Sequence, residues 1–294
     1  MITPSGEDSF SPFDDLLAGS LTSPWGPDQS YGPDHELLEG LLAVPVARGD
    51  SWQSGRFIKA LDVWIAQELR RAGLGEDEVW PRRVRPRVLA PALAELQRSL
   101  NPPVPAPVRK LLKGSVGARL FGEFYVKQVD VALADWDRGA ELIVSTKSQL
   151  SSFGNNQKNR FEEAVGDLRN LRGRYPLAAL GFAYLVRSTI LDEKGQWEFA
   201  QDMTRKLRLD DRGYDATVLL VADWDDDSGE VELLTDEVPE DLGTEQFFAN
   251  LLGGLLERTP VAFHVRAREL YEDRSLGLEE GVEPVEDPEE SREG

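Results

Sequence analysis

Apolar residues recur with a helical period in the first part of the chain and with a strand period in the second. Between residues 51 and 73 the apolar positions fall every three or four residues, which predicts an amphipathic helix. A second helix is predicted at residues 88–100, directly before the rigid connector NPPVPAP. Residues 1–48 show neither period and are rich in Pro, Gly, Ser and Asp, so we expect them to form a disordered tail.

Strand and helix patterns alternate beyond residue 120. The expected elements are strands at residues 121–134 and 140–147, a helix at 156–172, a nearly continuous apolar strand at 177–189, a helix at 197–207, a hairpin at 214–234 and a helix at 245–257. The turn DWDRG should pair the first two strands as an antiparallel hairpin. A helix joins the second strand to the third, so these two are expected to be parallel. The pattern predicts an α/β (α+β) fold with a mixed central sheet.

These patterns divide the chain into four regions. They are an acidic disordered tail (1–48), a helical region with a basic segment (49–120), an α/β core (121–270) and a second acidic tail (271–294). The formal net charge is -20, yet residues 81–119 carry nine Lys and Arg against one Glu. That basic segment suits phosphate contacts despite the overall acidity. The tails suit solvation, or contact with a protein partner.

Composition removes several kinds of chemistry. The chain has no cysteine and only two histidines, His35 and His264, which excludes disulfides and thiolate nucleophiles and leaves little material for a Ser/His/Asp triad. Catalysis would rest on carboxylates, lysine, hydroxyls and a hard metal ion. No apolar run is long enough to span a bilayer and the first residues lack a signal-peptide pattern, so we expect a cytoplasmic protein without membrane contact.

Lys147 stands at the polar end of an apolar strand. Strand side chains alternate, so Ser145, Lys147 and Gln149 share one face, and Asp130 of the partner strand is expected beside Lys147. An ion pair across the hairpin is the simplest interpretation. The next helix, however, carries Glu162 on the flank of its buried face, and its N-terminal N–H groups favour an anion. Asp130, Glu162 and Lys147 together could instead cleave a phosphodiester with a bound metal.

This order of residues resembles the PD-(D/E)xK nuclease superfamily, the fold of many restriction endonucleases. The resemblance covers residues 121–189: an Asp at the start of one strand, fourteen residues, a strand ending in x-x-Lys, a helix and an apolar strand. It implies a restriction-endonuclease-like αβββαβ core. Ser145 stands where the family usually has a second acid. The chain resembles the variant with Ser-x-Lys and a displaced carboxylate, here Glu162 or Glu163.

The resemblance implies a Mg²⁺-dependent endonuclease acting on DNA, of restriction or genome-defence type, with Mn²⁺ as a substitute. Asp130, Glu162 and the carbonyl of Thr146 would bind the metal. Lys147 would orient the attacking water or stabilise the phosphate charge, and Ser145 would hydrogen-bond a metal-bound water. The second-rank candidates are Glu163, Glu123, Gln149, Arg187 and Lys158.

An interaction protein that kept the nuclease-like sheet but lost its chemistry is the alternative. Ser145 and the overall charge favour it, whereas Asp130, Lys147, Glu162 and the basic segment favour the nuclease, which is our prediction. A palindromic DNA target would call for a homodimer, although no dimerisation signal stands out.

Overall fold

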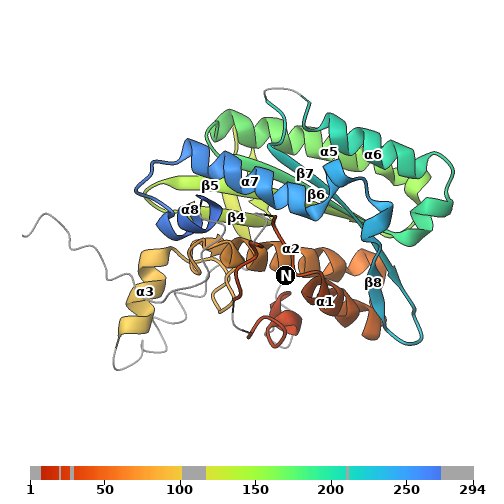
Figure 1. Cartoon of the computed structure of the whole chain (residues 1–294), viewed down its shortest axis with the longest axis horizontal. Helices are drawn as coiled ribbons and strands as arrows, with labels where there is room; N and C mark the ends of the chain where they lie inside the picture. The colour runs from red at the N-terminus through yellow and green to blue at the C-terminus, as the bar shows by residue number, and fades with distance from the viewer. Residues whose placement is uncertain (1–7, 20, 27–29, 101–116, 210–211, 273–294) are drawn as a thin grey trace, which may run out of the picture.

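A six-stranded mixed sheet forms the centre of the molecule in the computed structural model (Figure 1), which describes residues 8–19, 21–26, 30–100, 117–209 and 212–272. The strands lie in the order β1 (Val79–Trp80), β4 (Val131–Asp135), β5 (Gly139–Gln149), β6 (Ala179–Arg187), β7 (Ala216–Trp224) and β8 (Val231–Leu233). β5, β6 and β7 are parallel, and the remaining neighbours are antiparallel. A separate hairpin pairs β2 (Ala118–Phe121) with β3 (Val126–Val129).

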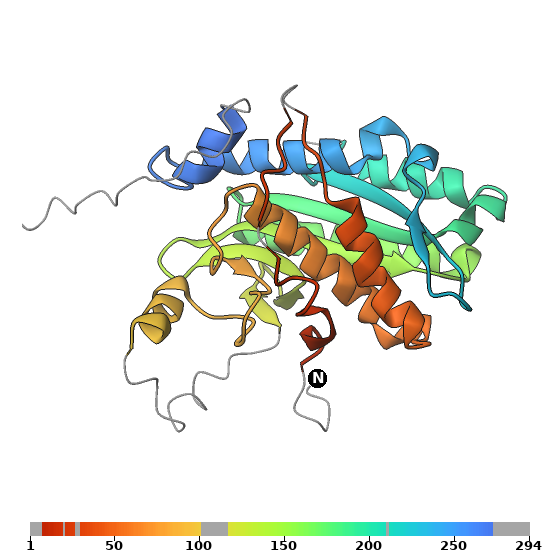
Figure 2. The same cartoon turned by 60° about the horizontal axis from the view of Figure 1, so that its bottom comes forward.

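Helices cover both faces of the sheet. The α-helices among the described residues are α1 (His35–Ala47), α2 (Arg56–Arg71), α3 (Pro91–Ser99), α5 (Phe153–Arg174), α6 (Gln196–Lys206), α7 (Thr244–Arg258) and α8 (Val265–Glu272). Short 3-10 turns are η1 (Ser11–Phe13), η2 (Trp52–Ser54), η3 (Ser188–Asp192), η4 (Thr235–Glu237) and η5 (Glu240–Leu242). The helices α1, α2 and α7 pack on one face and α5 and α6 on the other, as Figures 1 and 2 show. The expected mixed α/β fold is confirmed.

The alternation of β5 assigns its side chains to two separate cores. Leu142 and Val144 belong to the cluster formed with α1, α2 and α7, and Ile143 belongs to the cluster formed with α5 and α6. Thr146 therefore lies on the α2 face of the sheet and Lys147 on the α5 face. The expected alternation of β5, with Leu142, Val144 and Thr146 on one face and Ile143 and Lys147 on the other, is confirmed.

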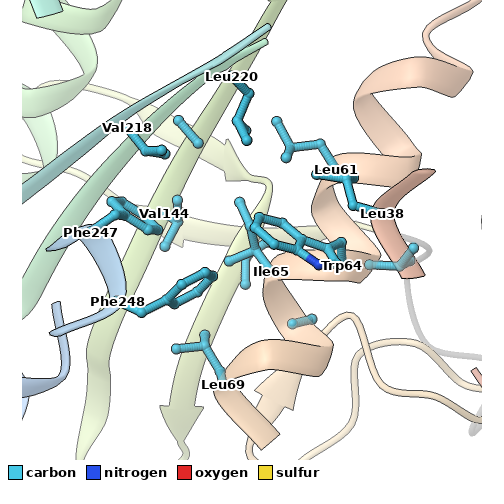
Figure 3. Packing of buried hydrophobic residues seen from close by; sticks show 14 of the residues in the cluster. Leu38, Leu61, Trp64, Ile65, Leu69, Val144, Val218, Leu220, Phe247 and Phe248 are labelled. Atoms are coloured by element: carbon cyan, nitrogen blue, oxygen red, sulfur yellow. The ribbon is translucent and has the colours of Figure 1, made fainter. Parts of the chain in front are cut away.

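Trp64 is the central residue of the α2 face. Its ring is fully buried and makes an edge-to-face contact with Phe248 at 5.4 Å between centroids, and its indole N–H donates to the carbonyl of Asp34 at 2.8 Å. Figure 3 shows it among side chains of α2, α7 and the sheet. Truncating such a residue costs about 3–5 kcal/mol, so the burial of α2 contributes a large share of the stability of this layer.

The hairpin between β4 and β5 forms where the sequence predicts it. Asp135 ends β4 and Gly139 begins β5, with the backbone of Gly139 in the left-handed region at φ 83°. Glycine adopts this conformation without a steric cost, which explains the turn DWDRG. The predicted strand at residues 121–134 is interrupted, because β3 and β4 are separated at Asp130 and β2 folds back on β3.

The prediction of a disordered tail at residues 1–48 is wrong for the described part of that segment. Phe10, Phe13 and Tyr31 are buried in the α2-side core, and α1 begins at a cap in which the Asp34 carboxylate accepts the N–H of Leu37. Aromatic residues spaced along a polar segment here act as anchors. The expected acidic tail at 271–294 lies outside the described residues from position 273 onward.

The described part of the basic segment is largely committed to internal ion pairs. Arg82 and Arg87 are buried, the first against Asp77 and the second against Asp8 and Asp14. Their expected role in gripping DNA is therefore not supported. Residues 101–116 of this segment lie outside the described part. Among the described residues, no helix is long and apolar enough to cross a membrane.

Candidate functional site

Asp130 is positioned by the break between β3 and β4. Its carboxylate accepts the backbone N–H of Thr146 on β5 at 3.1 Å. The Thr146 hydroxyl in turn donates to Asp62 of α2 at 2.6 Å, and the other Asp62 oxygen pairs with Lys59 at 2.6 Å. A chain of polar contacts thus runs from the end of β3 through β5 into α2.

Burial and the neighbouring Asp62 carboxylate raise the pKa of Asp130 to about 6, against the opposing effects of Lys59, the Thr146 N–H and Lys147. Burial lowers the pKa of Lys59, but the charges of Asp62 and Asp130 outweigh it and raise that pKa above its ordinary value. Asp62 is fully buried, whereas Asp130 keeps some solvent-accessible surface. Two carboxylates therefore share one partly accessible environment beside lysine ammonium groups.

Lys147 lies on the opposite face of the sheet in a second charged cluster. Its Nζ is 3.4 Å from Glu163 and 3.6 Å from Asp167, both on α5. Asp167 also binds Lys127 of β3 at 2.6 Å. Because Lys147 lowers the pKa of Asp130, the two clusters interact electrostatically, and Asp130 lies where they meet.

Glu162 does not join Asp130, contrary to the helical-wheel expectation. Its side chain is 64% exposed and pairs with Lys158 on the outer side of α5 at 3.7 Å. The sheet-facing positions of α5 are Phe161, Ala164 and Leu171, and the adjacent positions 163 and 167 reach Lys147. The α5 glutamate that pairs with Lys147 is therefore Glu163, the second-rank candidate, and Lys158 is an exposed partner of Glu162.

Ser145 faces the same side as Lys147 and is buried. Burial raises the pKa of Tyr214, and the adjacent Ser145 hydroxyl partly offsets that effect, so the two side chains lie together in the α5-side core. This placement does not direct Ser145 toward Asp62 and Asp130.

The remaining second-rank candidates make structural contacts. Gln149 accepts from the Tyr184 hydroxyl at 2.8 Å and donates to the Ser152 carbonyl at 2.9 Å, which holds the chain between β5 and α5. Glu123 pairs with Arg169 at 2.7 Å. Arg187 stacks on Trp224, with 4.2 Å from the guanidinium carbon to the ring centroid. None of these contacts includes Lys147 or Asp130.

Sequence reasoning missed Asp62 and Asp167. Asp62 lies within the apolar stripe of the helix at 51–73. Burying an acid there costs free energy unless the acid has a polar partner. An acid in an apolar stripe was therefore the sequence signal for a buried polar site. Asp167 follows Glu163 by four residues on α5, a spacing that places both on one side of the helix. The lysine partners of these acids come from distant segments, which a single-sequence pattern cannot pair.

The predicted metal ligands do not assemble as a set, because Glu162 points away from Asp130. Among the described residues, no group of three or more His, Asp or Glu side chains is placed to hold a metal ion. Asp62 and Asp130 are two hard oxygen donors close enough for the charge of Asp62 to raise the pKa of Asp130. Both Asp62 oxygens are bonded, one to the Thr146 hydroxyl and one to Lys59. Magnesium often binds through one or two carboxylates together with waters and substrate phosphates, so the donor types of this pair suit such an ion, whereas the predicted trio does not come together.

The described residues define an α/β protein with a buried cluster of carboxylates and lysines at the end of a central strand pair. Comparisons with protein-family models, with curated proteins and with solved structures gave no match.

Proposed function

We propose that this protein is a metal-dependent nuclease that hydrolyses DNA phosphodiester bonds, of restriction or genome-defence type. The observation that carries the proposal is the carboxylate of Asp130, which accepts the Thr146 N–H and shares its surroundings with Asp62, Lys59 and Lys147. Strongly perturbed carboxylates in such surroundings are typical of functional sites. In the proposed αβββαβ core, α2, β1, β4, β5, α5 and β6 would be the six elements, with α3, β2 and β3 inserted between β1 and β4.

Asp62 and Asp130 would hold the Mg²⁺, or Mn²⁺, of this proposed site. Such an ion supplies Lewis acidity to the phosphate and lowers the pKa of a bound water. Lys59 positions Asp62 through its ion pair, and Thr146 fixes both carboxylates, one through its N–H and one through its hydroxyl. Lys147 would turn from Glu163 and Asp167 toward the phosphate and stabilise the charge that develops there.

Two observations favour the alternative of an inactive, nuclease-like interaction protein. Lys147 is bound by two carboxylates, Glu163 and Asp167, which compete with a phosphate for its ammonium group. Ser145, in the place of the second acid, is buried and supplies no carboxylate. A protein that had lost catalysis would show the same two features.

Cleavage of supercoiled plasmid, of linear duplex and of single-stranded DNA, with Mg²⁺, Mn²⁺ or EDTA, separates the two proposals. We expect metal-dependent cutting by the wild type and a loss of at least about 100-fold, on the scale of removing one electrostatic contributor, in Asp62→Asn, Asp130→Asn and Lys147→Met. Glu162→Gln and Lys158→Met are matched controls on the outer side of α5 and should cut like the wild type. If no metal supports cutting, the interaction protein is the better proposal.

A further inference from the structure

The turn between β2 and β3 presents a cluster of apolar side chains to solvent. Phe121 is 71% exposed, Phe124 65%, Tyr125 49% and Val126 53%. Single exposed apolar residues are ordinary, but three aromatic residues within five positions of one short hairpin are not explained by the packing of the core. We call this set, Phe121, Phe124, Tyr125 and Val126, the aromatic hairpin.

The aromatic hairpin is held rigidly although its side chains are exposed. Asn170 of α5 is fully buried, and its side-chain oxygen accepts the N–H groups of Phe124 at 2.8 Å and Tyr125 at 3.2 Å. Its amide nitrogen donates to the Tyr125 carbonyl at 3.2 Å, and its own carbonyl accepts the Glu123 N–H at 2.8 Å. A fixed backbone lowers the entropy that the aromatic rings lose when they bind a ligand.

A cationic group accompanies the rings. The guanidinium carbon of Arg169 lies 5.5 Å from the centroid of Phe124, while Arg169 also pairs with Glu123. Arg119 is exposed on β2 of the same hairpin. Aromatic faces combined with arginine are the surface on which unpaired bases stack, and the arginines complement the phosphates of the strand.

The hairpin leads directly into the candidate site. β3 ends at Val129, and the next residue is Asp130, so Val126 and Asp130 are separated by about 13 Å of extended chain. Lys127, between them, binds Asp167, which also binds Lys147. A nucleic-acid strand stacked on the aromatic rings would therefore have its phosphate backbone near the cluster of Lys147 and near the cluster of Asp130.

We propose that the aromatic hairpin is a stacking platform that delivers single-stranded nucleic acid to Asp130. The proposal rests on the proposed nuclease function and specifies its substrate as unpaired rather than fully paired. In a duplex the base faces are already stacked, so exposed rings favour unpaired bases. The net charge of -20 opposes the binding of phosphates, so stacking must supply much of the affinity.

Binding is measured in EDTA, so that no cutting occurs, by fluorescence anisotropy of the full chain with labelled oligo(dT), oligo(U) of equal length and a blunt duplex. We expect both single strands, or oligo(dT) alone, to bind more tightly than the duplex. Phe124→Ala and Tyr125→Ala should each weaken single-strand binding by roughly 5- to 150-fold, the range for loss of one stacked base. Phe124→Trp should preserve binding, because a larger ring still stacks.

Trp136→Ala is the matched control, because Trp136 is 73% exposed at the far end of β4 from Asp130. It should bind oligo(dT) as the wild type does, and circular dichroism checks that every variant keeps its fold. Duplex binding as tight as single-strand binding, or alanine variants that bind normally, would overturn the platform. The absence of any nucleic-acid binding would do the same and point to a protein partner for the aromatic hairpin.

The platform and the nuclease fail in different ways. Metal-dependent cutting of duplex DNA, with single-strand binding unaffected by Phe124→Ala, would retain the nuclease and overturn the platform. Single-strand binding that requires Phe124, without cutting under any metal, would support the platform and overturn the nuclease.

Discussion

At the scale of single residues, the burial of Asp130 makes its ionised form unfavourable in the folded state. An acid whose pKa is raised by burial and by a second carboxylate is stabilised in its protonated form. The folded protein therefore holds this proton up to about pH 6, whereas the unfolded chain releases it near its ordinary pKa of 3.8. Between these values the folded state binds more protons than the unfolded state, so the contribution of Asp130 to stability falls as the pH rises.

Replacing Asp130 by Asn should remove this pH dependence. We expect the difference in unfolding free energy, wild type minus Asp130→Asn, to fall by on the order of 2–3 kcal/mol between pH 4 and pH 6.5 and to stay level above that. Urea unfolding of both proteins across this range measures the difference and cancels the titration of other groups. Glu162→Gln, which removes an exposed acid paired only with Lys158, should give a nearly flat difference. A flat curve for Asp130→Asn would show that the carboxylate titrates normally.

Asp130 and Lys147 of this charged cluster could be singled out from local sequence pattern, and its other members could not. Asp130 and Lys147 stand out as polar residues at defined places in strands, and the structure brings their charges within mutual influence. Glu162 and Glu163 are neighbours on one helix, and choosing between them needs the rotation of α5 on the sheet, which depends on tertiary packing. Asp62 comes from a helix distant in sequence, so only the assembled layers place it beside Asp130.

At the scale of elements, the β2–β3 turn depends on a partner outside its own sequence. The residues before Asp130 alternate like a strand, and the expected strand at 121–134 follows from that alternation. The turn forms because Asn170 of α5 supplies hydrogen-bond partners to its backbone. Gly122 permits this approach, because a Cβ there would lie 2.1 Å from the Asn170 amide nitrogen.

Asn170→Ala should loosen the aromatic hairpin. It removes the partners of three backbone groups, and each group left unsatisfied costs about 1–3 kcal/mol, although solvent will reach some of them. We expect a loss of about 2–3 kcal/mol in unfolding free energy, with faster amide hydrogen exchange concentrated at residues 122–126. Asn250→Ala, which removes a half-buried amide bonded to the exposed Gln246 on α7, is the matched control and should change stability by less than about 0.5 kcal/mol. Unchanged exchange at the turn would show that it is stable without Asn170.

At the scale of the whole molecule, the N-terminal segment is part of the folded core. The composition of this segment suggested disorder because the segment is polar and lacks periodicity. Its residues Phe10 and Phe13 are nevertheless buried in the core. What holds the segment is Arg87, only 2% exposed, which binds Asp8 at 3.0 Å and Asp14 at 2.7 Å across more than seventy residues of sequence. Such long-range pairing leaves no local signal in the chain.

Arg87→Met should therefore release the N-terminal segment. Removing Arg87 leaves the buried Asp8 carboxylate with the half-exposed Arg85 as its remaining cationic partner, and breaking a buried ion pair in this way costs up to about 3–5 kcal/mol. Arg85 also pairs with Asp8 but its side chain is 50% exposed, so Arg85→Met should cost less than about 1 kcal/mol and serves as the matched control. Urea unfolding gives the two losses, and limited proteolysis should cut Arg87→Met near residues 8–19 well before the core. If both variants lose the same small stability and resist cleavage there, the aromatic anchors Phe10 and Phe13 hold the segment without the ion pairs.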